Sequence, residues 1–318
     1  MSGTDAALTA GRARPALWLA VFCGAIALGL AWLPFRSNDL IAGKPLSEDG
    51  FYVLSVARNI ATGHGVTIDG VEPTNGFQPL FALATTPAFI VSPQSRFVAL
   101  RIVLGLHWLV YLATALLLGL IARDMFDDEE FRSARFWLTA FLYLASLHAF
   151  AVHFNGLETG LAMMLYALAW RVYQIRGAET LANAAIIGAL LGLTVLARID
   201  ASLLVAVFCI HLAIRRRIAR AAIVATTAVV VSAPWWAYNL AAFGSLMPSS
   251  GTAQMGSDVS IHRVGRALDA AAQAALPMLY AGHSERLWMS LARGTIAGVR
   301  GASVGMVGPD RASPQTRR

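Results

Sequence analysis

Residues 47–79 read SEDGFYVLSVARNIATGHGVTIDGVEPTNGFQP, a polar stretch with long apolar runs on either side. Two adjacent carboxylates, Glu48 and Asp49, begin an amphipathic segment, and a loop rich in Gly, His, Asp and Asn follows it. A polar segment between apolar runs is where we expect binding or catalytic residues, and the rest of the chain is interpreted around it.

The composition is typical of a membrane protein. Of the 318 residues, 57% are hydrophobic and only 14% are charged, whereas soluble domains carry roughly 25% charged residues. The net charge of +7 does not indicate nucleic-acid binding, because the basic residues stand in short loops between apolar runs. Cys23 and Cys209 both fall in apolar runs, so they indicate neither a disulfide nor a metal framework.

Seven apolar segments are candidates to cross a bilayer, whose core of about 30 Å needs about 20 apolar residues. They are residues 16–35, 97–121, 135–153, 157–175, 181–197, 200–214 and 221–241. An eighth apolar stretch, residues 79–91, contains Pro87 and would reach only about 20 Å as a helix.

The arginines indicate whether this eighth stretch crosses. If it does not, and the N-terminus is cytoplasmic, most loop arginines lie inside, including the run at 215–217. If it does, that run faces outward, against the preference of Lys and Arg for cytoplasmic loops. We therefore predict an all-α integral membrane protein with about seven transmembrane helices, in which residues 79–91 form a re-entrant or surface helix.

This topology predicts a transmembrane domain over residues 1–251, with juxtamembrane helices in a long first outer loop at 36–96. Residues 252–293 are predicted to form amphipathic surface helices, and residues 294–318 a disordered tail. Four polar clusters then share the outer face: residues 48–78, 155–159, 198–200 and 243–251.

Each candidate residue has a structural and a functional interpretation. Asp49 fits the cap of the following helix, or a general base that activates an acceptor hydroxyl while Glu48 holds a cation or the acceptor. Asn155 and Glu158 complement a helix dipole, or Glu158 contacts substrate or metal.

Arg198, at a tight turn between two apolar segments, also has two interpretations. It pairs with Asp200, or it contacts a lipid-linked phosphate, and we favour the second. His148 and His153 are interpreted as hydrogen-bonded histidines rather than metal ligands.

At these residues the chain resembles the GT-C superfamily of multispanning glycosyltransferases, which includes the protein O-mannosyltransferases and the bacterial lipid A aminoarabinose transferases. It is most similar to a prokaryotic branch with the pattern DDaYYYl-iArniaeG-GfTfdG--pTNGfhPLw. The similarity extends over about residues 15–250. It includes EDGFY at 48–52, ARNI at 57–60, GHG at 63–65, PTNGFQPL at 73–80, NGLET at 155–159, RID at 198–200 and FGSLMP at 243–248.

The resemblance implies an inverting transfer of a sugar from a polyprenyl-phosphate donor to a hydroxyl of a glycan, lipid or protein, at the outer face of the plasma membrane. Asp49 would take the proton of the acceptor, and polyprenyl phosphate would leave. The candidates for binding the donor phosphate or substrate are Arg198, Arg58, Glu158, Asp200, His64, Asn75 and Asn155. No metal ligands are predicted, and a divalent cation is the one cofactor left open.

Three positions depart from the branch: Glu48, Gln78 and Ile199 stand where Asp, His and Pro are usual. Members also continue through several more spans and an outer C-terminal domain, so we expect this chain to be short at its C-terminus, which puts its full activity in doubt. The alternative function is non-catalytic: a transporter or flippase subunit for lipid-linked sugars, or an inactive paralogue. A transporter favours charges at mid-bilayer and paired repeats, whereas these charges flank the apolar segments.

Overall fold

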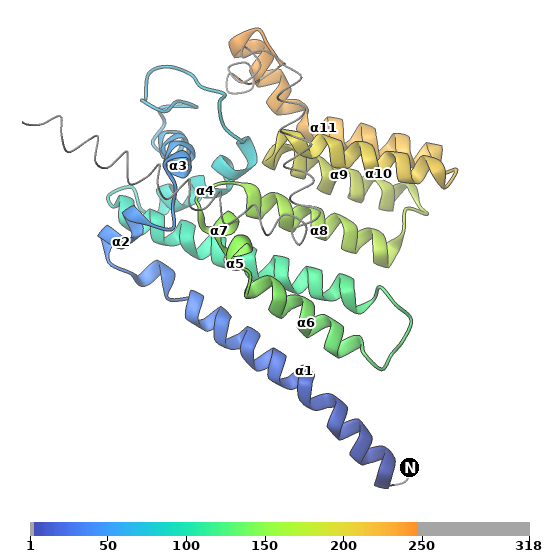
Figure 1. Ribbon diagram of the computed structural model, residues 1–318. Coiled ribbons are helices and arrows are strands. Elements are labelled where there is room, and N and C mark those ends of the chain that lie inside the picture. The colour runs from blue at the N-terminus through green and yellow to red at the C-terminus, as the bar shows by residue number, and fades with distance from the viewer. Residues whose placement is uncertain (1–2, 247, 249–318) are drawn as a thin grey trace, which may run out of the picture. The chain divides into compact units, whose positions relative to one another are not determined.

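The computed structural model describes residues 3–246 and residue 248, with the backbone alone for residues 3–14. The predictions for residues 252–293 and 294–318, and part of the polar cluster at 243–251, lie outside these described residues. Within them the chain is all-helical and contains no β-strand, which confirms the predicted class (Figure 1). The helices are α1 (Gly3–Leu30), η1 (Leu33–Phe35), α2 (Asn38–Gly43), α3 (Glu48–Ala61), α4 (Pro79–Val91), α5 (Arg96–Arg123), α6 (Arg132–Leu144), α7 (Leu147–Phe154), α8 (Thr159–Arg176), α9 (Leu181–Ala197), η2 (Ile199–Ala201), α10 (Ser202–Ile214) and α11 (Ile218–Phe243).

Three segments are long and apolar enough to cross a membrane: Pro15–Phe35, α5 and α11. α6 and α7 add a fourth if the two count as one broken span. The helices α4, α9 and Ile199–Ile214 are apolar but shorter. The described part of the chain therefore contains three or four candidate spans, and the count of seven stays a prediction.

Residues 135–153, predicted as one candidate span, form two helices and not one. α6 ends at Leu144, α7 begins at Leu147, and their axes differ by 63°. The Ser146 hydroxyl accepts a hydrogen bond from the Ala149 amide at 3.2 Å and so caps the new helix. Hydropathy continues through this break, because the residues on both sides are apolar.

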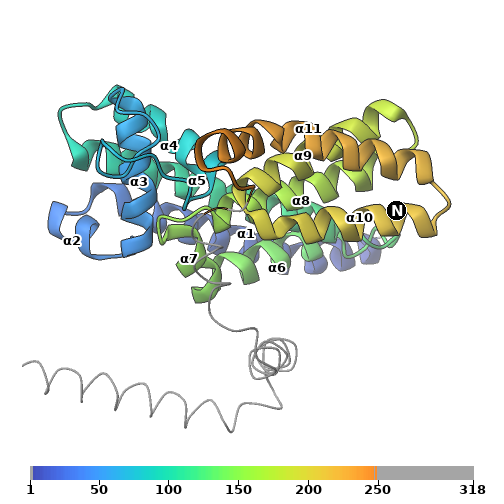
Figure 2. The same cartoon turned by 90° about the horizontal axis from the view of Figure 1, so that it is seen from above.

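α9 and α11 pack closely through two glycines on α9. A Cβ atom at Gly188 would lie 2.6 Å from the carbonyl oxygen of Val224, and one at Gly192 would lie 2.8 Å from that of Ala228. Small residues four apart allow two helix backbones to approach in this way, a common arrangement in membranes. Figure 2 shows α8, α9, α10 and α11 running alongside one another.

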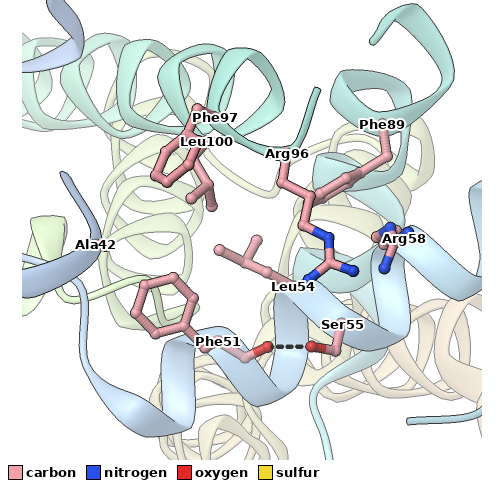
Figure 3. A pocket seen from close by; sticks show the side chains of 9 residues that line it. All are labelled: Ala42, Phe51, Leu54, Ser55, Arg58, Phe89, Arg96, Phe97 and Leu100. Atoms are coloured by element: carbon pink, nitrogen blue, oxygen red, sulfur yellow. Dashed lines mark hydrogen bonds between the residues drawn. The ribbon is translucent and has the colours of Figure 1, made fainter. Parts of the chain in front are cut away.

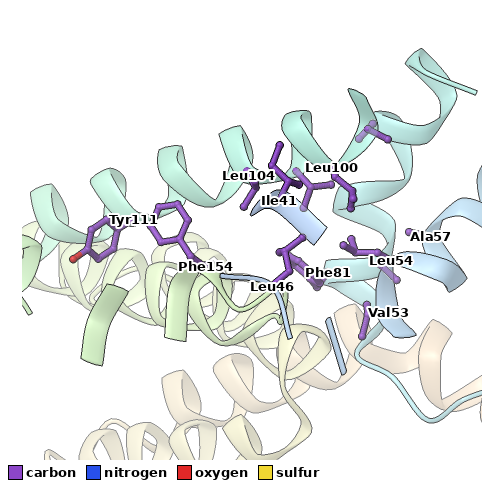
Figure 4. Packing of buried hydrophobic residues seen from close by; sticks show 14 of the residues in the cluster. Ile41, Leu46, Val53, Leu54, Ala57, Phe81, Leu100, Leu104, Tyr111 and Phe154 are labelled. Carbon is purple, nitrogen blue, oxygen red and sulfur yellow. The ribbon is translucent and has the colours of Figure 1, made fainter. Parts of the chain in front are cut away.

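The largest buried apolar cluster lies where α3, α4, α5 and α7 meet (Figure 4). Leu54 from α3, Phe81 from α4 and Leu104 from α5 are each at most 2% exposed. Tyr111 of α5 is fully buried beside Phe154, and its hydroxyl donates to the backbone of α6. This cluster fixes the helices of the first predicted loop against α5.

Arginines gather at the ends of the helices that lie away from α3, at the connections α5–α6, α8–α9 and α10–α11. Arg171 of α8 lies 2.6 Å from the Asp124 carboxylate at the end of α5, which also binds Arg132 of α6. Arg217, before α11, pairs with Glu179 of the α8–α9 connection at 2.6 Å. The connections α5–α6, α8–α9 and α10–α11 therefore share an arginine-rich end.

Candidate functional site

The N-terminus of α3 carries the two carboxylates that the sequence singles out. Ser47, and not Asp49, is the helix cap: its hydroxyl accepts from the Gly50 amide at 3.1 Å. The prediction of Asp49 as the cap is therefore wrong. Glu48 and Asp49 occupy the first turn and are exposed, where their charge complements the positive end of the helix dipole.

This first turn packs directly on the turn between α7 and α8. The Ser47 amide and hydroxyl both donate to the carbonyl oxygen of Asn155, at 2.8 and 2.9 Å. A Cβ atom at Gly50 would lie 2.6 Å from that same oxygen and 2.9 Å from the Cα of Gly156. Gly156 itself has φ +84, which favours glycine. Two glycines therefore allow this contact, which places the first turn of α3, and with it the exposed Asp49, beside the turn that precedes Glu158.

Glu158, Arg198 and Asp200 form one ion-pair cluster. The Arg198 guanidinium lies 3.1 Å from Glu158 Oε1 and binds both oxygens of Asp200, at 3.0 and 2.7 Å. It also donates to the Thr159 hydroxyl at 3.2 Å. The predicted Arg198–Asp200 pair is thus present, and a lipid phosphate would have to share this guanidinium with two carboxylates.

The two carboxylates of this cluster differ in environment. The Glu158 side chain is 8% exposed and that of Asp200 is 63% exposed. Glu158 precedes the first residue of α8, and burial raises the pKa of its carboxyl although Arg198 lowers it. Asp200 lies in η2, between α9 and α10, where the hydrogen bonds from Arg198 lower its pKa. Asp200 is therefore the readily ionised partner, and Glu158 the one that takes up a proton more easily.

The loop at 62–78 is held between α3 and α11. The hydroxyls of Tyr52 and Thr74 are 2.7 Å apart, and the Tyr238 hydroxyl donates to the Thr74 carbonyl at 3.2 Å. The Asn59 side chain donates to the Thr67 carbonyl at 3.0 Å. None of these residues is among the catalytic or binding candidates that the sequence analysis names. Tyr52, Asn59 and Thr74 stand in the motifs at 48–52, 57–60 and 73–80, but these motifs do not show which groups the three side chains contact.

Three further candidates, Asn75, His64 and Arg58, come from the first loop. Asn75 is buried within the loop, and His64 is exposed with its Nδ1 2.8 Å from the Thr62 hydroxyl. Arg58 follows Asp49 by nine helical residues, which is about 13.5 Å along α3 and half a turn around it. No contact joins Arg58 or His64 to the Glu158–Arg198–Asp200 cluster in the described part of the chain.

Histidines do not form a metal centre in the part of the chain that the structure describes. His153 is buried and its Nδ1 lies 2.9 Å from the carbonyl oxygen of Ala149, whereas His148 is exposed. Among the described residues, no three His, Cys, Asp or Glu side chains could hold a metal ion together.

None of the protein families, curated proteins and solved structures compared with this chain matches it.

Proposed function

We propose that the chain is a membrane glycosyltransferase of GT-C type, which moves a sugar from a polyprenyl-phosphate donor to a hydroxyl acceptor with inversion. The observation that carries the proposal is the contact between the first turn of α3 and the turn at 155–156. That contact places the first turn of α3, with Asp49, beside the turn that precedes Glu158, which binds Arg198. Residues that resemble the superfamily in separate parts of the sequence thus meet at one end of the helices.

The proposed topology has seven spans in the plasma membrane, with the N-terminus in the cytoplasm and the cluster on the extracytoplasmic side. The spans are α1, α5, the pair α6–α7, α8, α9, α10 and α11. The separation of charge supports this arrangement, because the arginine-rich connections lie at the opposite end from Asp49 and follow the usual preference for the cytoplasm.

In the proposed reaction Asp49 accepts the proton of the acceptor hydroxyl. The hydroxyl oxygen forms a bond to the anomeric carbon of the sugar, and the bond from that carbon to the phosphate oxygen breaks. The electron pair leaves with polyprenyl phosphate, whose negative charge Arg198 stabilises. Glu48, beside Asp49, orients the acceptor or a cation.

The exposure of each side chain in the Glu158–Arg198–Asp200 cluster indicates its proposed role. The Arg198 side chain is 36% exposed, so a phosphate can reach the guanidinium, which it would share with Asp200 and Glu158. Glu158 holds the guanidinium from the buried side. Arg58 is left out of the reaction, because it faces away from Asp49 on α3.

Replacement of the general base tests the proposal. Asp49→Asn should lower transfer by about 10²-fold or more, the usual contribution of a positioned base, without changing insertion or abundance. The assay follows release of polyprenyl phosphate from a panel of labelled polyprenyl-phosphate hexoses in membrane vesicles. Asp39→Asn removes another exposed carboxylate from the first turn of a helix in the same loop and should leave transfer unchanged. Equal transfer by Asp49→Asn and the parent chain would reject the assignment of Asp49 as the base, whereas a parent chain that transfers none of the sugars would favour the non-catalytic alternative.

A further inference from the structure

Two arginines stand at an apolar cavity where α2, α3, α4 and α5 meet (Figure 3). Its volume is about 330 Å³. Arg58 comes from the second half of α3, and Arg96 is the first residue of α5. The two also share a small neighbouring cavity against Phe89, so their guanidinium groups lie near each other.

No carboxylate compensates the charge of these two arginines in the described part of the chain. No carboxylate lines either cavity, and neither arginine has an ion-pair partner among the residues that the structure describes. Arg96 also occupies a helix N-terminus, where the dipole disfavours a cation. Among the described arginines, those that pair with carboxylates are Arg123, Arg132, Arg135, Arg171, Arg198 and Arg217. Arg58 and Arg96 belong to the group that does not, and they are the two that share an apolar cavity. The cavity therefore favours an anion.

The walls of the cavity require an apolar portion in the same ligand. Phe51 and Leu54 of α3 face Phe97 and Leu100 of α5 across it. Leu54 and Leu100 are buried, at 2% and 7% exposure. Because α5 is a candidate span that begins at this point, the cavity sits at the end of an apolar helix, where phosphate and acyl chain meet in a bilayer.

We infer that this cavity binds an anionic membrane phospholipid, with the phosphate between Arg58 and Arg96 and the first part of one acyl chain against Phe97 and Leu100. Arginines near a membrane surface attract anionic headgroups, and the planar guanidinium group binds phosphate with two donors. The volume is at the lower end of the roughly 300–1,000 Å³ of ligand pockets, which suits part of a lipid and not a whole one. The site is independent of the proposed transfer, because Arg58 faces away from Asp49.

The test measures retention of phosphatidylglycerol by the purified full chain in native mass spectrometry. Arg58→Gln combined with Arg96→Gln should weaken retention roughly tenfold or more, the effect of losing two charge contacts near a membrane. Arg215→Gln combined with Arg216→Gln removes the same charge from exposed arginines outside the cavity and should leave retention unchanged. Ala42→Trp, at an exposed residue of the cavity wall, keeps both arginines and should weaken retention by filling the space for the chain.

Competition experiments distinguish a phospholipid from inorganic phosphate and from polyprenyl phosphate as the ligand of the cavity. Phosphatidylglycerol should bind more tightly than phosphatidylcholine with the same chains, and inorganic phosphate should not displace it. Equal retention by the Arg58–Arg96 double variant and the parent would overturn the site. Displacement by polyprenyl phosphate at lower concentration than by phosphatidylglycerol would overturn the phospholipid assignment, and an unaffected Ala42→Trp variant would contradict the position of the chain.

Discussion

Arg198 is the residue whose contacts constrain the chemistry most tightly. It holds a buried carboxylate, Glu158, and an exposed one, Asp200, so its removal leaves a buried charge without a partner. Replacement of Arg198 alone would therefore lower both stability and donor binding. A second substitution at Glu158 distinguishes the two effects, because it removes the buried charge and leaves only the loss of donor binding.

Arg198→Ala should lower the unfolding free energy by about 2 kcal/mol, below the usual cost of breaking a fully buried pair because Arg198 is partly exposed. Glu158→Gln combined with Arg198→Ala should recover part of this stability, because the neutral amide needs no cation. Both variants should show a raised KM for the donor. Apparent melting temperature and the dependence of transfer on donor concentration measure the two effects. An unchanged donor dependence in both variants would exclude Arg198 from the donor site.

The charged residues of the site can be identified from the sequence, but most of the contacts between them cannot. Glu158, Arg198 and Asp200 are visible as charges beside apolar runs, and the structure joins all three. The role of Ser47 as cap and the contact of Gly50 with Gly156 are not visible, because they depend on a pairing across more than a hundred residues. Local spacing carries no information about such a pairing.

At the scale of elements, the packing of α9 on α11 depends on two glycines of α9, whose lack of a side chain lets the two helices approach closely. Gly188 and Gly192 lie in contact with carbonyl oxygens of α11, which are backbone atoms and cannot move aside as a flexible side chain can. Hydropathy identifies both segments as apolar, but it does not show which face of α9 meets α11. The same limit explains why the break between α6 and α7 was not predicted.

Gly192→Leu should therefore separate α9 from α11 and destabilise the chain by about 1–3 kcal/mol, the usual cost of overpacking. The measurement is the apparent melting temperature of the purified chain in detergent. Gly24→Leu is the matched control, because a Cβ atom at Gly24 in α1 meets nothing within 4 Å. Equal melting temperatures for Gly192→Leu and Gly24→Leu would show that the close approach of α9 and α11 does not contribute to stability.

At the scale of the whole described chain, polar residues are divided between two ends of the helices. One end holds the first turn of α3 and the Glu158–Arg198–Asp200 cluster, and the other holds Asp124 and Glu179 with their arginines. The alternation of apolar runs and loops in the sequence anticipates this division. The number of spans that produce it cannot be derived from hydropathy alone, because α4, α9 and α10 are short.

Accessibility of single cysteines tests this division and the proposed orientation most directly. In a chain with Cys23→Ala and Cys209→Ala, one cysteine is placed at Asp49 and, in a second variant, at Arg216; both positions are exposed. A membrane-impermeant maleimide should label position 49 in intact spheroplasts, and position 216 only after the membrane is permeabilised. Labelling of both positions from the same side, or of position 216 alone in intact spheroplasts, would contradict a catalytic Asp49 on the extracytoplasmic side.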